Sequence, residues 1–335
     1  MTFRPFRFAS LIAAGAALAL ATATTFAQAP AAPAPTVRIG LISTGSIDLR
    51  AHLEQALLDG LRAEGLVEGV NLLVERRYAD GVNERLPVFA SEVALMKLDA
   101  VVTTCTLSTR AAKASITDTP IVMLAVSDPV ANGLIASLAR PGRNITGVSS
   151  QAEEIMPKML ELFSSVLPRR TTVAVLANAG NAVHKSMWNT LAAPGQSLDL
   201  KLVRIEIRSP ADLPAAFDSA VAARAGALFV LADDPLIFNL RARIVDAAAR
   251  LTLPDFYWSS EFVEAGGLMS YGENLGSSYR DGARYVAKVV RGARPEDLPV
   301  AQPTRFELTL NARTAKSHGI ALPQSLLVRA DRVIE

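Results

Sequence analysis

Short apolar runs alternate with longer amphipathic segments along the first half of the sequence. The apolar runs predict buried parallel strands over 37–43, 71–79, 99–104, 121–126 and 144–149. The segments between them predict helices over 48–65, 84–97 and 108–115. A further short helix is expected after Ser127-Asp128-Pro129, ending at Pro141-Gly142. Strands that alternate with helices form right-handed crossovers, so this half predicts a parallel sheet covered on both faces.

The same alternation starts again in the second half. Strands are expected over 172–177, 200–207, 226–232 and 255–258, with helices over 182–193, 210–223 and 235–250. The late elements are an amphipathic helix over 279–295, a strand over 305–310 and a final helix over 312–318. The predicted fold class is therefore α/β, with two open sheets and a crevice between them, where such folds bind ligands.

The N-terminal segment has the pattern of an export signal instead. Arg4 and Arg7 precede an Ala-rich apolar run over 11–23, which is shorter than the ~20 residues that a membrane span needs. No cysteine lies near the small residues that follow, so a lipid anchor is not expected. We expect a Sec-type signal peptide over 1–29, a Pro/Ala-rich tether over 30–36, and a soluble mature protein in the periplasm.

Charge and cysteine content exclude several kinds of partner. The chain has 34 Lys+Arg and 32 Asp+Glu, and the basic residues form no block, which argues against nucleic acid. Cys105 is the only cysteine, so an internal disulfide and a cysteine-rich metal site are both excluded. No later segment is long and apolar enough to span a bilayer.

The motifs of the common enzyme classes are missing. The first expected strand is followed by STGSIDLR, which is not a G-x-G-x-x-G turn, and no phosphate-binding loop or nucleophile elbow occurs. His52, His184 and His318 fall on expected helices, away from the strand ends. No spacing of His, Cys, Asp and Glu fits a metal site. We therefore expect no enzymatic activity, no cofactor and no metal.

Polar and aromatic side chains gather where the expected strands end. They are Ser43, Thr44, Ser46, Thr104, Cys105, Thr106, Ser127, Asp128, Asn178, Asp233, Tyr257, Ser260 and Glu261. Two interpretations stay open for the polar ones. Such residues are preferred helix caps, yet parallel strands bring their carboxyl ends to one edge of a sheet, where the set would line a ligand site. Helix N-termini there favour a carboxylate, and Asp128 or Glu261 could meet a cationic group of the same ligand.

Four long segments resemble one protein family. They read GLRAEGLVEGVNLLVERRYADG, SDPVANGLIASLARPGRNITGVS, EFVEAGGLMSYG and GARPEDLPVAQPTRFELTLNARTAKSHGIALPQSLLVRAD. From Val37 to its C-terminus the sequence is similar to the ABC-transporter substrate-binding proteins of the tryptophan/tyrosine-binding type, a branch of the type I periplasmic binding proteins. The resemblance implies two Rossmann-like lobes with parallel sheets, joined by a three-stranded hinge and closing over a small molecule.

The resemblance also implies a ligand and partners. Family members are associated with amino acids, aromatic ones among them, and deliver them to an ABC permease with its ATPase in the inner membrane. Asp128 would face the cleft. One departure from the family is that Cys105 and Leu107 follow the third expected strand, where small residues, Gly or Pro are usual, and they narrow that wall. Tyr257 and Trp258 would add a stacking face, so we expect a ligand with an apolar or aromatic body and a charged end.

On this basis the mature chain divides into two lobes. The first is expected over 37–149 plus about 272–300, and the second over 150–271 plus about 301–335. The predicted function is a monomeric periplasmic receptor that delivers an amino acid or small carboxylate to an ABC importer. The alternative is an exported sensor that signals to a sensor kinase or chemoreceptor, because both roles use the same closed surface of the lobes.

Overall fold

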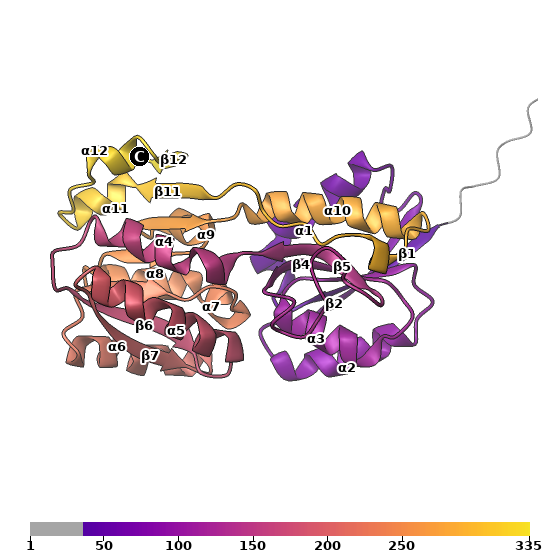
Figure 1. Ribbon diagram of the computed structural model, residues 1–335, viewed down its shortest axis with the longest axis horizontal. Helices are drawn as coiled ribbons and strands as arrows, with labels where there is room; N and C mark the ends of the chain where they lie inside the picture. The colour runs from indigo at the N-terminus through magenta and orange to yellow at the C-terminus, as the bar shows by residue number, and fades with distance from the viewer. Residues whose placement is uncertain (1–35) are drawn as a thin grey trace, which may run out of the picture. The chain divides into compact units, whose positions relative to one another are not determined.

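The first of two sheets is entirely parallel. The computed structural model describes residues 36–335, and the predicted signal peptide and nearly all of the tether lie outside them. Five strands form this sheet in the order β2-β1-β3-β4-β5 (Figure 1). They are β1 (Val37–Ser43), β2 (Leu72–Tyr78), β3 (Ala100–Thr103), β4 (Ile121–Ser127) and β5 (Ile145–Ser150). The inner strand β3 is buried along its whole length, as expected for a sheet with helices on both faces.

The second sheet has seven strands in the order β12-β11-β10-β9-β8-β6-β7. They are β6 (Thr172–Asn178), β7 (Lys201–Ile207), β8 (Ala227–Val230), β9 (Asp255–Tyr257), β10 (Met269–Gly272), β11 (Glu307–Asn311) and β12 (Arg332–Ile334). Every pairing is parallel except that of β10 with β11. We call the first sheet with its packed helices the first lobe, and the second sheet with its helices the second lobe.

The helices follow the strands in the alternation that the sequence predicts. In chain order they are α1 (Ile47–Ala63), α2 (Leu86–Ala94), α3 (Thr106–Ser115), α4 (Ala152–Ser164), α5 (Ala182–Ser197), α6 (Leu213–Ala222), α7 (Pro235–Asn239), α8 (Arg241–Arg250), α9 (Ser260–Glu264), α10 (Leu275–Val290), α11 (Ala312–Ser317) and α12 (Gln324–Leu327). The α/β fold of two mostly parallel sheets is therefore confirmed.

Helix α10 comes late in the chain but packs on the first sheet. It lies against α1 and against β4 and β5 (Figure 1). Gly282 permits this approach, because a Cβ there would lie 2.0 Å from the Leu124 side chain of β4. Ala301, further along the chain, then pairs with Val148 of β5 before the chain continues to β11 of the second sheet. The chain thus crosses between the sheets after β5, after β10 and before β11.

The second lobe has an aromatic core of its own. Phe229 of β8 and Phe256 of β9 stack with ring centres 5.7 Å apart, and Phe163 of α4 lies 5.4 Å from Phe256. All three side chains are fully buried. Burying a side chain of this size stabilises a fold by roughly 1.5–3 kcal/mol, so α4 is fixed firmly to the second sheet.

The segment between β4 and β5 differs from the expectation. The predicted short helix after Pro129 is wrong, because residues 128–144 form turns. Asp128 and Gly133 both have positive φ, of 29° and 66°, which an α-helix does not allow. Asn132-Gly133 is a strong turn pair, and Pro129 donates no N–H, so local turn chemistry prevails over the apolar spacing of this segment.

Other differences are smaller. The helix expected over 235–250 is two helices, α7 and α8, separated at Leu240. The elements that the sequence pattern did not predict are α4, α9, α12, β10 and β12. Most of them are shorter than the windows in which a hydrophobic period can be recognised.

Candidate functional site

Loops at the carboxyl ends of both sheets line one cavity of about 50 Å³. Its walls come from α1, α7 and α10, from Ala125 within β4, from the end of β5 with the start of α4, and from the segments that follow β3, β8, β9 and β10. The carboxyl edges of parallel sheets are the usual place for ligands in open α/β folds.

Arg50 supplies the cation of the first lobe's wall. It lies near the start of α1 and is 91% buried, being 9% exposed. Its guanidinium carbon lies 4.9 Å from the centre of the Phe238 ring on α7 of the second lobe. Gly45 leaves room for this side chain, because a Cβ there would lie 2.5 Å from Arg50 Nε. The charge is thus held at the cavity by packing against glycine and an aromatic face.

The turn from β3 into α3 brings Thr104 and Cys105 to the cavity. Ser108 Oγ accepts the N–H groups of both residues, at 3.1 and 3.2 Å, which fixes the start of the helix. Cys105 Sγ lies 3.8 Å from Thr44 Oγ1. Burial raises the pKa of the Cys105 thiol, and the charge of Asp233 raises it further. The thiol is therefore held protonated and is a poor nucleophile.

Strand β4 is distorted where it reaches the cavity. Its register with β5 shifts between Met123 and Val126, and Ala125 has a φ of 49°. Ala125 lines the cavity. A bulge with a non-glycine residue in the left-handed region is a kind of strain that occurs preferentially at functional sites. Asp128 follows and is exposed; its Oδ1 accepts the N–H of Ala131 at 2.9 Å.

Asp234 organises the corresponding loop after β8. Its Oδ1 accepts the N–H of Ile237 at 2.8 Å and so caps α7. Its Oδ2 accepts from the side-chain amides of Asn178, at 2.9 Å, and Asn181, at 3.0 Å. Asp234 is 2% exposed. Since both oxygens are engaged within the fold, Asp234 positions the loop rather than offering a free carboxylate.

His184 of α5 supports the same loop from behind. Its Nδ1 accepts the N–H of Asn178 at 2.8 Å, and its Nε2 hydrogen bonds to the carbonyl oxygen of Ala232 at 2.8 Å. These two contacts require the tautomer with the proton on Nε2. Burial lowers the pKa of His184, so the ring is neutral and ties the end of β6 to the end of β8.

Asp233 is the carboxyl that this frame presents to the cavity. It has a φ of 55°, and its Oδ2 accepts from Thr106 Oγ1 of the first lobe at 2.8 Å. Burial raises the pKa of Asp233 to about 7 against the opposing hydrogen bond from Thr106, and the charges of Asp234 and Glu273 raise it further. Asp233 is thus an acid near half-ionisation at neutral pH, held next to the other lobe.

Two further carboxyls near the cavity have pKa values that are shifted in opposite directions. Glu273 follows β10 and accepts a hydrogen bond from Ser278 Oγ. Burial raises its pKa to about 7, and the charge of Glu261 adds to the effect. Glu261 accepts from His52 Nε2 of the first lobe, at 3.3 Å, and from Ser259 Oγ. Burial opposes its charge, but these two hydrogen bonds prevail and the pKa of Glu261 is lowered.

The adjacent aromatic residues at the end of β9 face different surroundings. Tyr257 is fully buried, stacks on Phe262 with ring centres 4.5 Å apart, and donates to Asp255 Oδ2 at 2.8 Å. Trp258 lines the cavity together with Phe238, and their ring centres are 6.5 Å apart. Successive side chains of a strand point to opposite faces, so only one of the two reaches the cavity.

Four buried polar atoms of cavity-lining residues have no hydrogen-bond partner within residues 36–335. They are Arg50 Nε, Thr104 Oγ1, Ser150 Oγ and Tyr279 OH. Three of these side chains are neighbours, because burial raises the pKa of Tyr279 and the side chains of Arg50 and Thr104 oppose that rise. Ser127 Oγ, at the end of β4, is also buried and has no hydrogen-bond partner among the described residues. Unpaired buried polar atoms are few in native proteins, because each costs roughly 1–3 kcal/mol of desolvation. Their concentration at one cavity marks it as a place where another molecule supplies partners.

The structure brings only part of the predicted site residues to the cavity. Thr104, Cys105 and Asp233 line it. Thr44, Thr106, Ser127 and Asn178 are not lining residues; the first two contact Cys105 and Asp233, Ser127 precedes Asp128, and Asn178 holds Asp234. The predicted residues whose side chains lie elsewhere are Ser43, Ser46, Asp128, Tyr257, Ser260 and Glu261.

Sequence reasoning missed the cavity residues that lie outside the predicted strand ends. They are chiefly Arg50, Phe238 and Tyr279 on helices, Ser150 at the end of β5, and Glu273 after β10. One feature of the sequence could have indicated Arg50, namely its position as a cation just after the polar turn STGS. Glu273 had none, because the short strand before it was not predicted.

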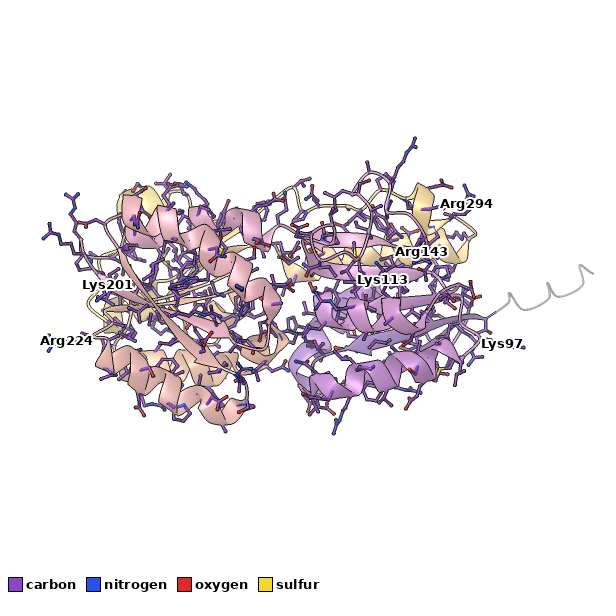
Figure 2. All side chains as sticks on the ribbon, turned by 60° about the horizontal axis from the view of Figure 1, so that its bottom comes forward. Lys97, Lys113, Arg143, Lys201, Arg224 and Arg294 are labelled. Atoms are coloured by element: carbon purple, nitrogen blue, oxygen red, sulfur yellow. The ribbon has the colours of Figure 1, made fainter. Side chains whose placement is uncertain are left out.

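Basic side chains are spread over both lobes. Figure 2 shows Lys201 and Arg224 on the second lobe, with Lys97, Lys113, Arg143 and Arg294 on the first. Within residues 36–335, no helix is long and apolar enough to cross a membrane. In the same part of the chain, no group of His, Cys, Asp and Glu is arranged to hold a metal ion.

Two mostly parallel sheets, three chain crossings and a cavity at their carboxyl edges define a type I periplasmic binding protein fold. The chain belongs to the ABC transporter substrate binding protein family, whose family model matches residues 38–334. This confirms the resemblance seen in the sequence.

Individual relatives agree with this assignment. The chain is 26% identical over 267 residues to the Tyrosine-binding protein of Clostridioides difficile (strain R20291), covering 79% of this chain and 75% of the relative. A conserved domain protein from Vibrio cholerae superposes with a TM-score of 0.83 at 27% identity, over 89% of this chain and 99% of that one. An ABC domain from Streptococcus pneumonia in complex with L-Trp gives 0.82 at 22% identity, over 89% and 100%.

Proposed function

We propose that this protein is an exported receptor that binds an amino acid or a small carboxylate, aromatic ones included, and delivers it to an ABC permease. The observation that carries the proposal is the set of partnerless buried polar atoms around the cavity, on Arg50, Thr104, Ser150 and Tyr279. All four side chains offer hydrogen-bond donors, and one of them is cationic, which suits a carboxylate.

The other side of the cavity suits the remainder of such a ligand. Trp258 offers an aromatic surface, and Asp233 and Glu273 offer carboxyls, whereas the Phe238 ring is already packed against the guanidinium groups of Arg50 and Arg241, each 4.9 Å from its centre. The names of two relatives, a tyrosine-binding protein and a complex with L-Trp, support an aromatic amino acid as the first class to test.

The size of the cavity supports a mechanism in which the lobes move. A space of about 50 Å³ holds a few water-sized groups, whereas small-molecule pockets measure roughly 300–1,000 Å³. An amino acid therefore enters only if the contacts between the lobes, such as Thr106 with Asp233 and His52 with Glu261, open and re-form around it.

The remaining parts of the proposal concern domains, location and partners. We propose that the first lobe comprises 37–149 and about 272–300, and the second 150–271 and about 301–335. The receptor acts as a monomer in the periplasm after removal of residues 1–29, and it binds no catalytic cofactor.

A thermal-shift screen of amino acids and small acids tests the function. A ligand that binds only the folded protein stabilises it by RT ln(1 + [L]/Kd), about 2.7 kcal/mol at a hundredfold excess over Kd. Arg50→Gln is the informative variant and Arg280→Gln, an exposed arginine on α10, the matched control. Loss of a shift in the first variant alone supports the site. Equal shifts in wild type and Arg50→Gln would place the ligand elsewhere.

A further inference from the structure

Arg50 is a buried cation without a counter-charge. Its side chain comes from α1 of the first lobe and is 9% exposed. It forms no ion pair with any Asp or Glu of residues 36–335, and its Nε has no hydrogen-bond partner among them. Buried charges in proteins are normally paired, because an ion that leaves water loses its hydration. The contact with the Phe238 ring offsets only a part of that loss.

The second lobe is what buries this cation. Phe238, whose ring contacts the guanidinium, lies on α7, and Asp233 and Trp258 of the same lobe line the cavity with it. Separation of the lobes would withdraw these residues from Arg50 and return its charge to water. The desolvation of Arg50 therefore opposes the closure of the lobes and not the folding of the first lobe.

A second cation opposes closure in the same way. Arg241 of α8, in the second lobe, packs on the ring that Arg50 contacts, with its guanidinium carbon 4.9 Å from the centre of Phe238. Burial lowers the pKa of Arg241 against the charge of Glu261, and the charge of Arg50 lowers it further. Closure thus brings two like charges to one aromatic ring.

The carboxyls of the cavity are not full counter-charges for Arg50. Asp233 and Glu273 each accept a hydrogen bond from a hydroxyl group, and Asp234 accepts from two asparagine amides. Burial raises the pKa values of Asp233 and Glu273 to about 7, so each is only partly ionised at neutral pH. The positive charge of Arg50 therefore lacks a fixed partner on either lobe.

Two hydroxyl groups of the first lobe stand beside Arg50 with their oxygens unpaired. Thr104 and Tyr279 line the same cavity, are 5% and 3% exposed, and have no partner for these oxygens among the described residues. The side chains of Arg50 and Thr104 both act on the Tyr279 hydroxyl, so the three are neighbours. A guanidinium and two hydroxyls are donors that suit one anionic group, and all three belong to the first lobe.

We propose that Arg50 makes closure of the lobes conditional on an anion: its unpaired charge keeps the lobes apart, and a ligand carboxylate bound by Arg50, Thr104 and Tyr279 lets them close. This inference rests on the proposed function and adds how that site is regulated, because the carboxylate is then needed for closure as well as for contact. The hydrogen bonds between the lobes favour closure in either case, so the charge of Arg50 decides between the two states.

The first test needs no ligand. Arg50→Met removes the charge and keeps an unbranched side chain that packs well on an aromatic ring, whereas Arg50→Lys keeps the charge. We expect small-angle scattering of unliganded Arg50→Met to give a smaller radius of gyration than wild type, and Arg50→Lys to give one no smaller than wild type. Arg280→Gln, which removes an exposed arginine of α10, is the matched control and should equal wild type.

A second neutral variant guards against a fault of folding. Arg50→Gln should contract as Arg50→Met does, and thermal melting shows whether each sample is folded. If both neutral variants are folded and neither is more compact than unliganded wild type, the inference is wrong. Contraction of Arg50→Lys to the same extent would also overturn it, because the charge would then not be the cause.

The second test compares L-tryptophan with L-tryptophanamide, in which an uncharged amide replaces the carboxylate. At about pH 6.5 the amino group of both probes is charged, so only the carboxylate differs. We expect wild type to prefer the acid by at least about a hundredfold in calorimetry, and this ratio to fall at least about tenfold in Arg50→Met. In scattering, L-tryptophan should contract the wild type and add little to Arg50→Met. The ratio of two affinities within one variant is independent of how much of the sample is folded.

The outcomes separate this inference from the proposed function. If wild type binds L-tryptophan but unliganded Arg50→Met stays as extended as wild type, the receptor stands and the role of Arg50 in closure is wrong. An unchanged ratio of acid to amide in Arg50→Met also overturns that role, because the carboxylate then acts elsewhere. If the neutral variants contract and no amino acid or small acid binds, the proposed function fails and the effect of Arg50 on closure stands.

Discussion

Ser127-Asp128-Pro129 after β4 and Asp233-Asp234-Pro235 after β8 are two loops of the same design. In each, an aspartate that precedes a proline accepts the N–H of the residue three positions later, Ala131 in one loop and Ile237 in the other. In each, one aspartate has positive φ, Asp128 at 29° and Asp233 at 55°.

The difference between the loops lies in burial and in the preceding residue. Asp128 is exposed and leads into turns, whereas Asp234 is buried, bound by two asparagine amides, and leads into α7. The residue before the cap is Ser127 in the first loop, with a partnerless hydroxyl, and Asp233 in the second, with its carboxyl at the cavity. The comparison indicates that the aspartate before the proline shapes each loop, whereas only the second loop places the residue before it, Asp233, at the cavity.

The largest expected effect distinguishes the two caps by stability. Asp234→Ala removes a buried carboxylate that accepts three hydrogen bonds and leaves the Asn178 amide without an acceptor and the Asn181 amide with only the carbonyl oxygen of Asp233, so we expect a loss of about 3 kcal/mol. Asp128→Ala removes one exposed hydrogen bond of a turn and places alanine at positive φ, so it should cost about 1 kcal/mol. Urea unfolding of both variants measures the difference. Similar losses in the two would show that the buried network adds nothing beyond the cap.

The next effect concerns ligand affinity at Asp233. Asp233→Asn keeps an oxygen that can accept from Thr106 Oγ1, and asparagine tolerates positive φ as well as aspartate does. We expect affinity for the bound amino acid to fall roughly thirtyfold, because one partner of a buried charge pair typically contributes about 2 kcal/mol or more. Calorimetry measures it. Unchanged affinity would mean that Asp233 contacts the other lobe and does not bind the ligand.

A smaller effect is expected in the pH dependence of stability. The pKa of Asp233 is about 7 in the folded protein, above the roughly 3.9 of an unfolded aspartate. Between these values the folded state holds a proton that the unfolded state has lost, so its contribution to stability decreases as pH rises from about 4 to 7 and then levels. Asp233→Asn lacks this term.

The stability of Asp233→Asn relative to wild type should therefore increase by roughly 1 kcal/mol or more from pH 4.5 to pH 8. Asp128→Asn, whose side chain is exposed, is the control and should run parallel to wild type. Melting curves at four pH values are sufficient. Parallel curves for all three proteins would mean that Asp233 is hydrated in the unliganded state.

The sequence predicted the sheets well because their signal is local. Runs such as 37–43 and 172–177 are apolar throughout and match β1 and β6. Of the residues predicted at strand ends, Thr104, Cys105 and Asp233 line the cavity. What could not be predicted depends on tertiary packing: which helix face turns Arg50 inward, and which of Tyr257 and Trp258 reaches the cavity. A shift of one position along a strand exchanges the two faces of the sheet and so would bring the other aromatic side chain to the cavity.

The smallest expected effect is that of Asp128→Asn. The side chain is exposed and accepts a hydrogen bond from the N–H of Ala131, and it does not line the cavity. Asparagine can accept the same hydrogen bond and tolerates positive φ as well as aspartate does, so stability should change by less than about 0.5 kcal/mol. Affinity should stay within about twofold of wild type, in contrast to Asp233→Asn. The two variants measured side by side make the same chemical change at the aspartate before the proline in the first loop and at the residue before that aspartate in the second, so they test which of the two positions serves the ligand. A thirtyfold loss of affinity in Asp128→Asn with normal melting would instead place the first loop at the ligand and require the lobes to close further than the present contacts between them.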